Sequence, residues 1–118
     1  DFVFYYSGNS DEKGHKYGWM GQEYMDAVAL ASQNIERIYN ALPEGYSMVI
    51  TADHGGHART HGTEMHEDMT IPIAFYGPQW EKGKALEQIR LLDIAPTIAD
   101  MMGCEIPADW DGVSLLKK

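Results

Sequence analysis

The sequence predicts an α/β fold with a mostly parallel sheet flanked by helices. Short apolar runs rich in β-branched and aromatic residues alternate along the chain with helical patterns, and this alternation is typical of parallel α/β folds. The chain has 118 residues, of which 44% are hydrophobic, which is enough for one domain with its own core. Because no repeat or linker divides the sequence, we expect residues 1–118 to belong to a single domain.

The first part of the chain is expected to contain two strands separated by a loop and a helix. Residues 2–7 are aromatic and β-branched without polar alternation, which indicates a buried, central strand. The polar, glycine-rich stretch 8–18 indicates a loop. Apolar residues recur at steps of three and four over 20–42 and predict an amphipathic helix, which Pro43-Glu44-Gly45 ends. Residues 46–52 form a second short apolar run and predict another strand.

The rest of the chain is expected to contain a long loop, two further strands and a helix. The loop runs from Asp53 to about Thr70, and the apolar run 71–76 predicts the third strand. A weaker pattern over 84–91 indicates a fourth strand. Asp93 has the residue type of a helix N-cap and is followed by a helical pattern, which Gly103 ends.

Composition excludes several classes of function. Acidic residues outnumber basic ones by 18 to 9, giving a net charge of −9, whereas binding to a nucleic-acid duplex requires a basic face. No apolar run approaches the roughly 18 residues of a membrane span. Cys104 is the single cysteine, which excludes an internal disulfide framework and a cysteine-rich zinc site. Four of the five histidines lie within 54–66, and histidine with carboxylates is the ligand mix of an N/O metal site.

Two Asp/His pairs each follow a predicted strand, where α/β folds place their functional groups. Asp11 and His15 are four residues apart in a polar segment, and both side chains can reach one divalent ion; two solvated loop residues are the alternative. Asp53 and His54 follow a strand directly, and Gly55-Gly56 permits the sharp turn that would let both bind one ion. The alternative is a plain turn around a buried, hydrogen-bonded aspartate.

The loop that follows Asp53 and His54 carries three further histidines and an arginine. A loop of about 15 residues without secondary structure is usually functional or disordered, and the histidines favour function, although most of them are expected to be solvated or hydrogen-bonded. Arg59 can pair with a substrate phosphate or with an acidic neighbour. Two metal ions about 3.5–4 Å apart can hold the attacking and leaving oxygens of a phosphoryl transfer, and the two Asp/His pairs suggest such an arrangement.

Several motifs resemble those of the alkaline phosphatase superfamily of metalloenzymes. Residues 51–56, Thr-Ala-Asp-His-Gly-Gly, resemble its T-x-D-H-G signature, and residues 11–18 are similar to the D-x-x-x-H-x-x-G segment of its nucleotide pyrophosphatase/phosphodiesterase branch. The resemblance continues, in the family's order, through His61-Gly62, Ile71-Pro72, Gly77-Pro78, the Asp93-Ile94-Ala95-Pro96-Thr97 helix start and Asp111-Gly112. It covers nearly the whole chain and implies part of an alkaline-phosphatase-like sheet.

The resemblance also implies a set of metal ligands. Asp11, His15 and His61 would hold one ion, and Asp53 and His54 would hold a second; the resemblance implies two divalent metal ions, with zinc as the expected metal. His66 is the alternative to His61, because its distance from Pro72 is similar to the spacing in the phosphomutase branch. His57 would then lie behind the ligands or face the substrate.

The function implied is that of a two-metal phosphodiesterase or nucleotide pyrophosphatase-like hydrolase acting on a small-molecule phosphate ester. The chain begins in an apolar run without a methionine, and we expect it to be the C-terminal part of a larger catalytic domain. Family members carry the nucleophile and a further Asp ligand upstream, so no catalytic residue is assigned within 1–118. We expect the chain alone to be inactive and to bind at most one metal ion well, at Asp11, His15 and His61. A phosphomutase or sulfatase of the same superfamily and a non-catalytic metal-binding α/β module are the alternatives.

Overall fold

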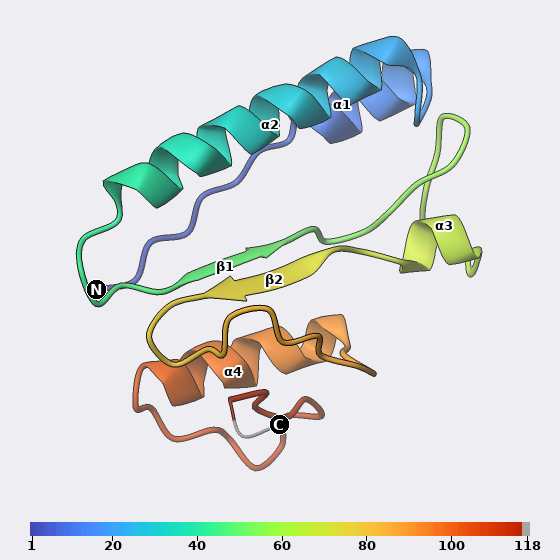
Figure 1. Cartoon of the computed structure of the whole chain (residues 1–118). Coiled ribbons are helices and arrows are strands. Elements are labelled where there is room, and N and C mark those ends of the chain that lie inside the picture. The colour runs from blue at the N-terminus through green and yellow to red at the C-terminus, as the bar shows by residue number, and fades with distance from the viewer. Residues whose placement is uncertain (117–118) are drawn as a thin grey trace. The chain divides into compact units, whose positions relative to one another are not determined.

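The computed structural model describes residues 1–116 and contains helices and two short strands (Figure 1). In chain order the elements are α1 (Asn9–Tyr17), α2 (Gln22–Ala41), β1 (Met48–Thr51), α3 (His66–Met69), β2 (Ile73–Tyr76), the 3₁₀ turn η1 (Leu91–Asp93) and α4 (Ile94–Met101). The chain forms two compact units. The first comprises residues 1–44 and 50–73, and the second comprises residues 45–49 and those from 74 onward.

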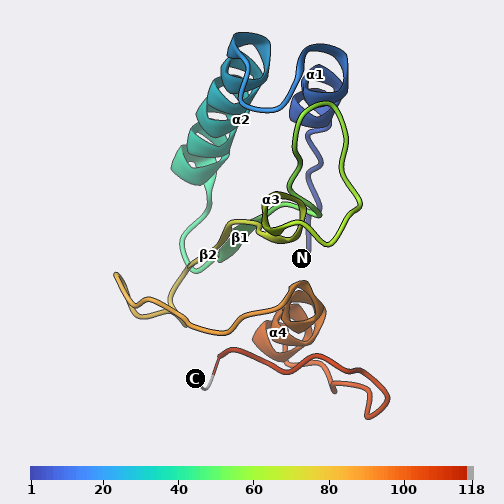
Figure 2. The same ribbon diagram turned by 90° about the vertical axis from the view of Figure 1, so that its right-hand side faces the viewer.

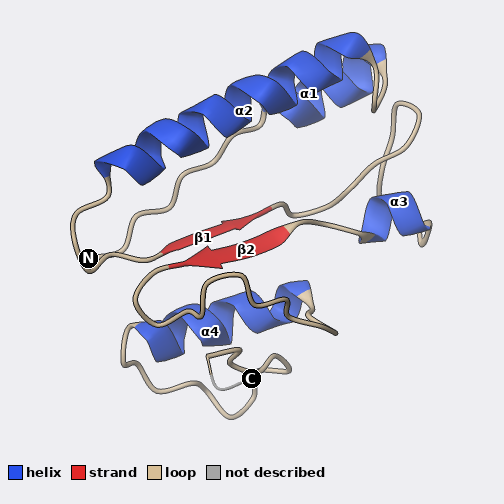
Figure 3. Cartoon of the chain, viewed as in Figure 1, coloured by secondary structure: helices blue, strands red, loops and turns tan. Residues whose placement is uncertain are grey.

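The strands β1 and β2 pair with each other in a two-stranded antiparallel sheet (Figure 3). The predicted mixture of helices and strands is therefore present, but the prediction of a mostly parallel sheet is wrong. A parallel pair needs a crossover connection, usually a helix, between its strands. The connection from β1 to β2 instead returns to the end of α1 (Figure 2), where the N–H of Trp19, in the turn after the helix, donates to the Ala58 carbonyl at 2.8 Å. The second strand can therefore run back along the first.

The predicted strand over residues 2–7 is not a strand in the structure. Its large side chains are exposed, with fractions from 54% for Tyr5 to 83% for Val3. The apolar pattern without alternation fits a strand that is covered on both faces, but such a strand needs neighbours to pair with. Within residues 1–116, β1 and β2 use each other, and no third strand is present to pair with this segment.

The segment predicted as a loop, residues 8–18, instead contains the helix α1. Acidic residues Asp11 and Glu12 lie in its first turn and Lys16 in its last, an arrangement that complements the helix dipole. Gly14 made the segment look like a loop, yet a Cβ at this position would lie 2.7 Å from the Trp19 ring. Glycine is therefore needed inside α1 for close packing and does not end the helix.

The predicted long helix is confirmed as α2, which lies beside α1 (Figures 1 and 2). Gln22 and Asp26 are hydrogen-bonded at 2.8 Å across its first turn, and Ala27 on this helix is 5% exposed. The helix ends at Ala41, and Leu42, the residue after it, has an extended backbone before Pro43. None of the helices within residues 1–116 has both the length and the apolarity needed to cross a membrane.

In the second unit, the predicted helix after Asp93 is confirmed as α4. Thr97 donates its hydroxyl to the Asp93 carbonyl at 2.5 Å and accepts the Leu115 N–H at 3.0 Å, which ties the last part of the chain to this helix. Gly103, with φ +68°, follows the end of the helix. The predicted strand over 84–91 is absent; the segment includes Gln88 at φ +56°, a left-handed conformation that interrupts an extended run.

Candidate metal centre

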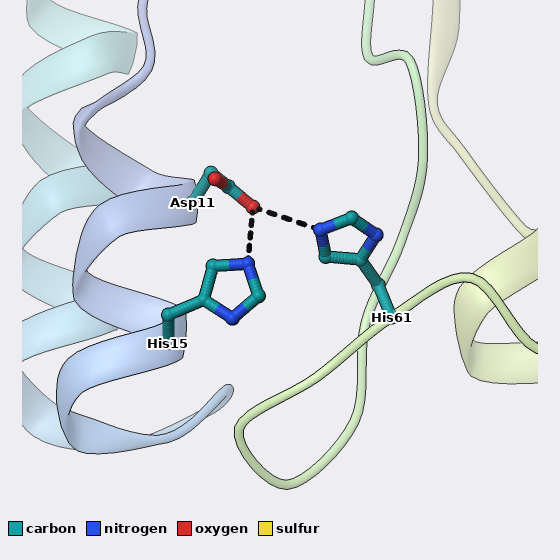
Figure 4. Close-up of side chains that lie close together, drawn as sticks. All are labelled: Asp11, His15 and His61. Carbon is teal, nitrogen blue, oxygen red and sulfur yellow. Dashed lines mark ion pairs between the residues drawn. The ribbon is translucent and has the colours of Figure 1, made fainter.

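Two of the predicted metal ligands lie on α1, one turn apart. Asp11 and His15 are four residues apart, which places both side chains on one face of a helix. The Asp11 Oδ1 atom lies 3.5 Å from His15 Nε2 (Figure 4). The helix, which the sequence did not predict, thus gives these two residues a fixed relative position that a loop would not give them.

The third predicted ligand, His61, comes from the loop between β1 and α3 and points toward Asp11 (Figure 4). His61 Nε2 lies 3.5 Å from Asp11 Oδ1. One ligand atom from each of Asp11, His15 and His61 lies within 4.8 Å of the other two. Donors around a zinc ion with bonds of about 2.0–2.1 Å would be separated by roughly 3.4 Å in a tetrahedral shell. These three side chains are therefore close to the spacing that one divalent ion requires.

The loop also orients the His15 ring. Its Nδ1 atom lies 3.0 Å from the Arg59 carbonyl oxygen, and a carbonyl can only accept, so Nδ1 must carry the hydrogen. In the neutral ring the lone pair is then on Nε2, the atom that faces Asp11. Such a hydrogen bond from the remote ring nitrogen is the usual way in which a protein orients a metal-binding histidine.

The second predicted pair lies beside the first. His54 Nδ1 is 2.7 Å from the Gly55 carbonyl oxygen, which leaves its Nε2 as the acceptor atom. That nitrogen lies 3.7 Å from Asp11 Oδ1 and 3.8 Å from Asp53 Oδ1. The His54 ring stacks on the His61 ring with centroids 3.6 Å apart. The structure thus brings together all the predicted ligands, although the Asp53 side chain is 74% exposed and lies at the edge.

The Asp11 Oδ1 atom is buried and has no hydrogen-bond partner among the described residues. Three imidazole Nε2 atoms, those of His15, His54 and His61, lie 3.5–3.7 Å from it. A buried carboxylate oxygen without a partner is costly, and the Nε2 lone pairs of the neutral His15 and His54 rings beside it add no compensation. A divalent cation would satisfy the carboxylate and the lone pairs together, so the residues present fit a metal ion.

A tryptophan that sequence reasoning did not single out forms one wall of the cluster. The Trp19 ring meets the His15 ring edge-on at 5.1 Å and the His61 ring at 5.9 Å between centroids. A Cβ on Gly56 would collide with the Trp19 ring, so the Gly55-Gly56 pair serves close packing rather than only a turn. The only signal of this ring in the sequence is the presence of glycine at positions 14 and 56, where a side chain would collide with it.

The remaining predicted residues of the loop lie outside the cluster. His57 Nδ1 is 2.7 Å from Asp68 Oδ1, and the Asp68 side chain is only 1% exposed. His66, the alternative to His61, is on α3, where its ring lies 3.2 Å from the Thr70 hydroxyl. The exposed Arg59 guanidinium makes no ion pair with an acidic residue within residues 1–116, so the acidic-neighbour alternative is not realised there.

The hydrogen bond from His57 is the largest influence on the pKa of Asp68, which is lowered from 3.8 to about 2. Burial raises this pKa, and hydrogen bonds from the Thr63 backbone and hydroxyl lower it further. Asp68 is therefore a charged carboxylate that the chain itself satisfies. Sequence reasoning missed it, because an acidic residue in an acidic stretch carries no signal of burial.

The fold and the cluster define a mixed α/β chain with a candidate Asp/His metal centre. The family model described as the metalloenzyme superfamily matches residues 1–106, and the chain belongs to this superfamily. The superfamily predicted from the motifs is thus confirmed at this level.

The similar proteins belong to a narrower class of enzyme than the superfamily. The chain is 33% identical to a 2,3-bisphosphoglycerate-independent phosphoglycerate mutase of Clostridioides difficile (strain 630), over 100% of this chain and 24% of the relative. It is 32% identical to the enzyme of the same name from Bacteroides thetaiotaomicron, over 99% of this chain and 24% of the relative. A third phosphoglycerate mutase, from Rhodopirellula baltica, is 29% identical over 99% of this chain and 22% of its own length.

These relatives are phosphoglycerate mutases and not phosphodiesterases. They agree with the phosphomutase alternative better than with the phosphodiesterase branch that the motifs favoured. The chain is related to their C-terminal part and spans about a quarter of their length. No solved structure gives a significant match.

Proposed function

We propose that the chain is the C-terminal metal-binding part of a metalloenzyme that transfers a phosphoryl group within phosphoglycerate. The observation that carries this proposal is the convergence of Asp11, His15 and His61 in a chain whose curated relatives are phosphoglycerate mutases. Residues 1–118 would then form the C-terminal part of a larger catalytic domain. The exposed aromatic residues of segment 2–6 support this, because such side chains are normally covered.

Within this proposal, Asp11, His15 and His61 hold the first divalent ion, and Asp53 with His54 hold part of a second. Imidazole and carboxylate donors suit zinc, and carboxylates also suit manganese. When bound, such ions supply Lewis-acid stabilisation of charge on a phosphoryl group. The chain's own contribution is to hold the donors: α1 sets the Asp11 and His15 spacing, and the Arg59 carbonyl fixes the His15 ring.

The nucleophile is proposed to lie outside residues 1–118. Thr51 is the last residue of β1, and its hydroxyl donates to the Ala52 carbonyl at 3.2 Å. The chain alone should therefore bind metal without turning over a phosphate ester, and activity should require the rest of the catalytic domain.

The first test is metal binding by the 118-residue chain, with Zn²⁺ and Mn²⁺ titrated separately by calorimetry and by competition with a chromophoric chelator. We expect His61→Ala to abolish the tight site and His66→Ala to leave it unchanged. His66 is the matched control, because it is in the same segment but outside the cluster. Equal affinities of the wild-type chain and His61→Ala would contradict the ligand assignment, and loss in His66→Ala alone would transfer it to His66.

A phosphodiesterase is the second candidate, and one observation favours it. Among the described residues it is His61, not His66, that joins Asp11 and His15, and the His61 spacing is the one that resembles the phosphodiesterase branch. The complete protein that carries residues 1–118 should be assayed with metal for phosphoglycerate mutase activity without added 2,3-bisphosphoglycerate, and for hydrolysis of bis(4-nitrophenyl) phosphate. Mutase activity alone supports the first candidate, and diester hydrolysis alone supports the second.

A further inference from the structure

The loop that carries His61 is attached to α3 by one buried carboxylate. Asp68 on α3 is 3% exposed, and both of its oxygens are used. Oδ1 lies 2.7 Å from His57 Nδ1, whereas Oδ2 accepts the Thr63 N–H at 2.9 Å and the Thr63 hydroxyl at 2.7 Å. His57 and Thr63 lie on the two sides of His61 in the chain, so Asp68 fixes the loop before and after this candidate ligand.

Backbone contacts extend the attachment to the neighbouring candidate ligand, His54. The Gly55 N–H donates to the Asp68 carbonyl at 2.8 Å, and the Gly56 N–H donates to the Glu67 carbonyl at 2.9 Å. A Cβ on Gly55 would collide with the Glu67 carbonyl. Backbone carbonyls of α3 therefore accept hydrogen bonds from the two residues that directly follow His54.

Between its two attachment points the loop is also closed on itself. The backbones of His57 and Thr60 exchange two hydrogen bonds, at 3.0 and 2.9 Å. This short bridge presents the Arg59 carbonyl to His15. These hydrogen bonds form one network. It holds the backbone on both sides of His61 and the Arg59 carbonyl that orients the His15 ring.

We infer that Asp68 is a positioning residue that pre-orders the loop carrying His61 for metal binding. This inference rests on the proposed metal site. Asp68 is too fully hydrogen-bonded to serve as a ligand, and His57 donates its Nδ1 hydrogen to it and so acts within the same network. Without the carboxylate, metal binding must order the 57–63 loop, and the entropy of that ordering lowers affinity. Loss of a group that hydrogen-bonds a ligand directly lowers metal affinity about 10- to 100-fold, and because Asp68 acts through His57 and Thr63, we expect about 10-fold, the lower end of that range.

The test compares Asp68→Asn with Asp100→Asn in the 118-residue chain. Asp100 is the matched control, because it also accepts a hydroxyl hydrogen bond, from Ser114, but lies on α4 in the second unit. We expect Asp68→Asn to weaken Zn²⁺ binding by about 10-fold and Asp100→Asn to leave it within about twofold of wild type. Thr63→Val should weaken binding in the same direction, and Thr63→Ser, which keeps the hydroxyl, should restore it.

A readout of His61 separates positioning from general loss of stability. In the metal-free chain at a temperature where every variant is folded by circular dichroism, the ¹⁵N-imidazole signals of His61 should shift in Asp68→Asn and remain unchanged in Asp100→Asn. A lower melting temperature with unchanged Zn²⁺ affinity and unchanged His61 signals would overturn the inference. Wild-type affinity in Asp68→Asn overturns this inference alone, whereas absence of Zn²⁺ and Mn²⁺ binding by the wild-type chain overturns the proposed metal site with it.

Discussion

The two units each contain a carboxylate with a buried oxygen, and the two carboxylates have opposite surroundings. In the second unit, Asp93 accepts hydrogen bonds of 3.0 Å from the Arg90 guanidinium, the Arg90 N–H and the Val113 N–H. In the first unit, Asp11 Oδ1 has no hydrogen-bond partner within residues 1–116 and faces three imidazole nitrogens. A carboxylate that its own chain satisfies stabilises a turn, whereas an unsatisfied one beside nitrogen lone pairs indicates a cation site.

The pKa of Asp93 shows that the hydrogen bonds to its carboxylate outweigh the effect of burial. Burial is the largest single influence and raises this pKa, but the hydrogen bonds from Val113 and Arg90 together outweigh it, so the pKa lies below its ordinary value. The same ion pair, between Arg90 and Asp93, closes the turn that starts α4. Asp93 is therefore charged and structural.

The largest expected effect is that of Asp11→Asn on metal binding. The amide keeps the shape but removes the charge, so the affinity for Zn²⁺ should fall by more than about 100-fold, beyond the range for an outer partner of a ligand. The metal-free chain should lose at most about 1 kcal/mol, from the charge that complements the dipole of α1, because Asp11 Oδ1 has no hydrogen bond to lose among the described residues. Chelator competition measures the first effect and urea unfolding in excess chelator measures the second. Destabilisation of the metal-free chain by about 2 kcal/mol or more, the loss expected for Asp93→Asn, would show that Asp11 is structural, as Asp93 is.

The next largest effect is that of Asp93→Asn, which should lower stability and not metal affinity. Loss of the charge weakens the hydrogen bonds that the buried Asp93 side chain accepts from Arg90 and Val113, and we expect the free energy of unfolding to fall by about 2 kcal/mol. Zn²⁺ affinity should be unchanged. Urea unfolding of the metal-free chain measures this, with Asp109→Asn as the exposed control that should stay within about 0.5 kcal/mol of wild type. A similar loss in both variants would contradict the role given to the Asp93 network.

Asp68 supplies a smaller effect, seen in the pH dependence of stability. Its pKa is lowered mainly by the hydrogen bond from His57, from 3.8 to about 2. A group whose pKa is lower in the folded state stabilises the fold above its unfolded pKa, and this contribution is lost as pH falls toward the folded pKa. The free energy of unfolding should therefore decrease between about pH 4 and pH 2, and this decrease should be shallower in Asp68→Asn.

Urea unfolding of the metal-free chain across this pH range measures the decrease. An equal slope in wild type and Asp68→Asn would mean that the network around Asp68 does not hold the carboxylate in its charged form.

The same contrast explains which parts of the molecule could be predicted from the sequence. The helices α2 and α4 were predictable because apolar periodicity and the residue type of Asp93 are local signals. The pairing of β1 with β2 was not, because it depends on the path of the loop back to α1. The strand expected over 2–7 depends on neighbouring strands, and local pattern carries no information about their presence.

The residues of the candidate site also divide into those that local sequence patterns indicate and those that only contacts between distant segments define. Asp11 and His15 were singled out by their spacing and Asp53 and His54 by their place after a strand, whereas their proposed roles as ligands were implied by the family resemblance. The helix that joins Asp11 to His15 was hidden by Gly14, whose purpose is to admit the Trp19 ring. Trp19 and Asp68 are defined by contacts between distant segments, so no pattern of neighbouring residues could single them out.

The smallest expected effect is that of Asp53→Asn, which refines the comparison within the cluster itself. The Asp53 side chain is 74% exposed, and Oδ1 accepts a 3.1 Å hydrogen bond from the His54 N–H. An exposed charge contributes little, about 0–1 kcal/mol, so Asp53→Asn should change the affinity of the tight site by less than about fivefold. Calorimetry with Zn²⁺ gives both the affinity and the stoichiometry of the tight site in Asp53→Asn and Asp11→Asn. A loss in Asp53→Asn as large as that in Asp11→Asn would mean that one ion is shared by Asp11, Asp53 and His54. The two metal positions would then have to be redrawn around the single oxygen that His15, His54 and His61 all face.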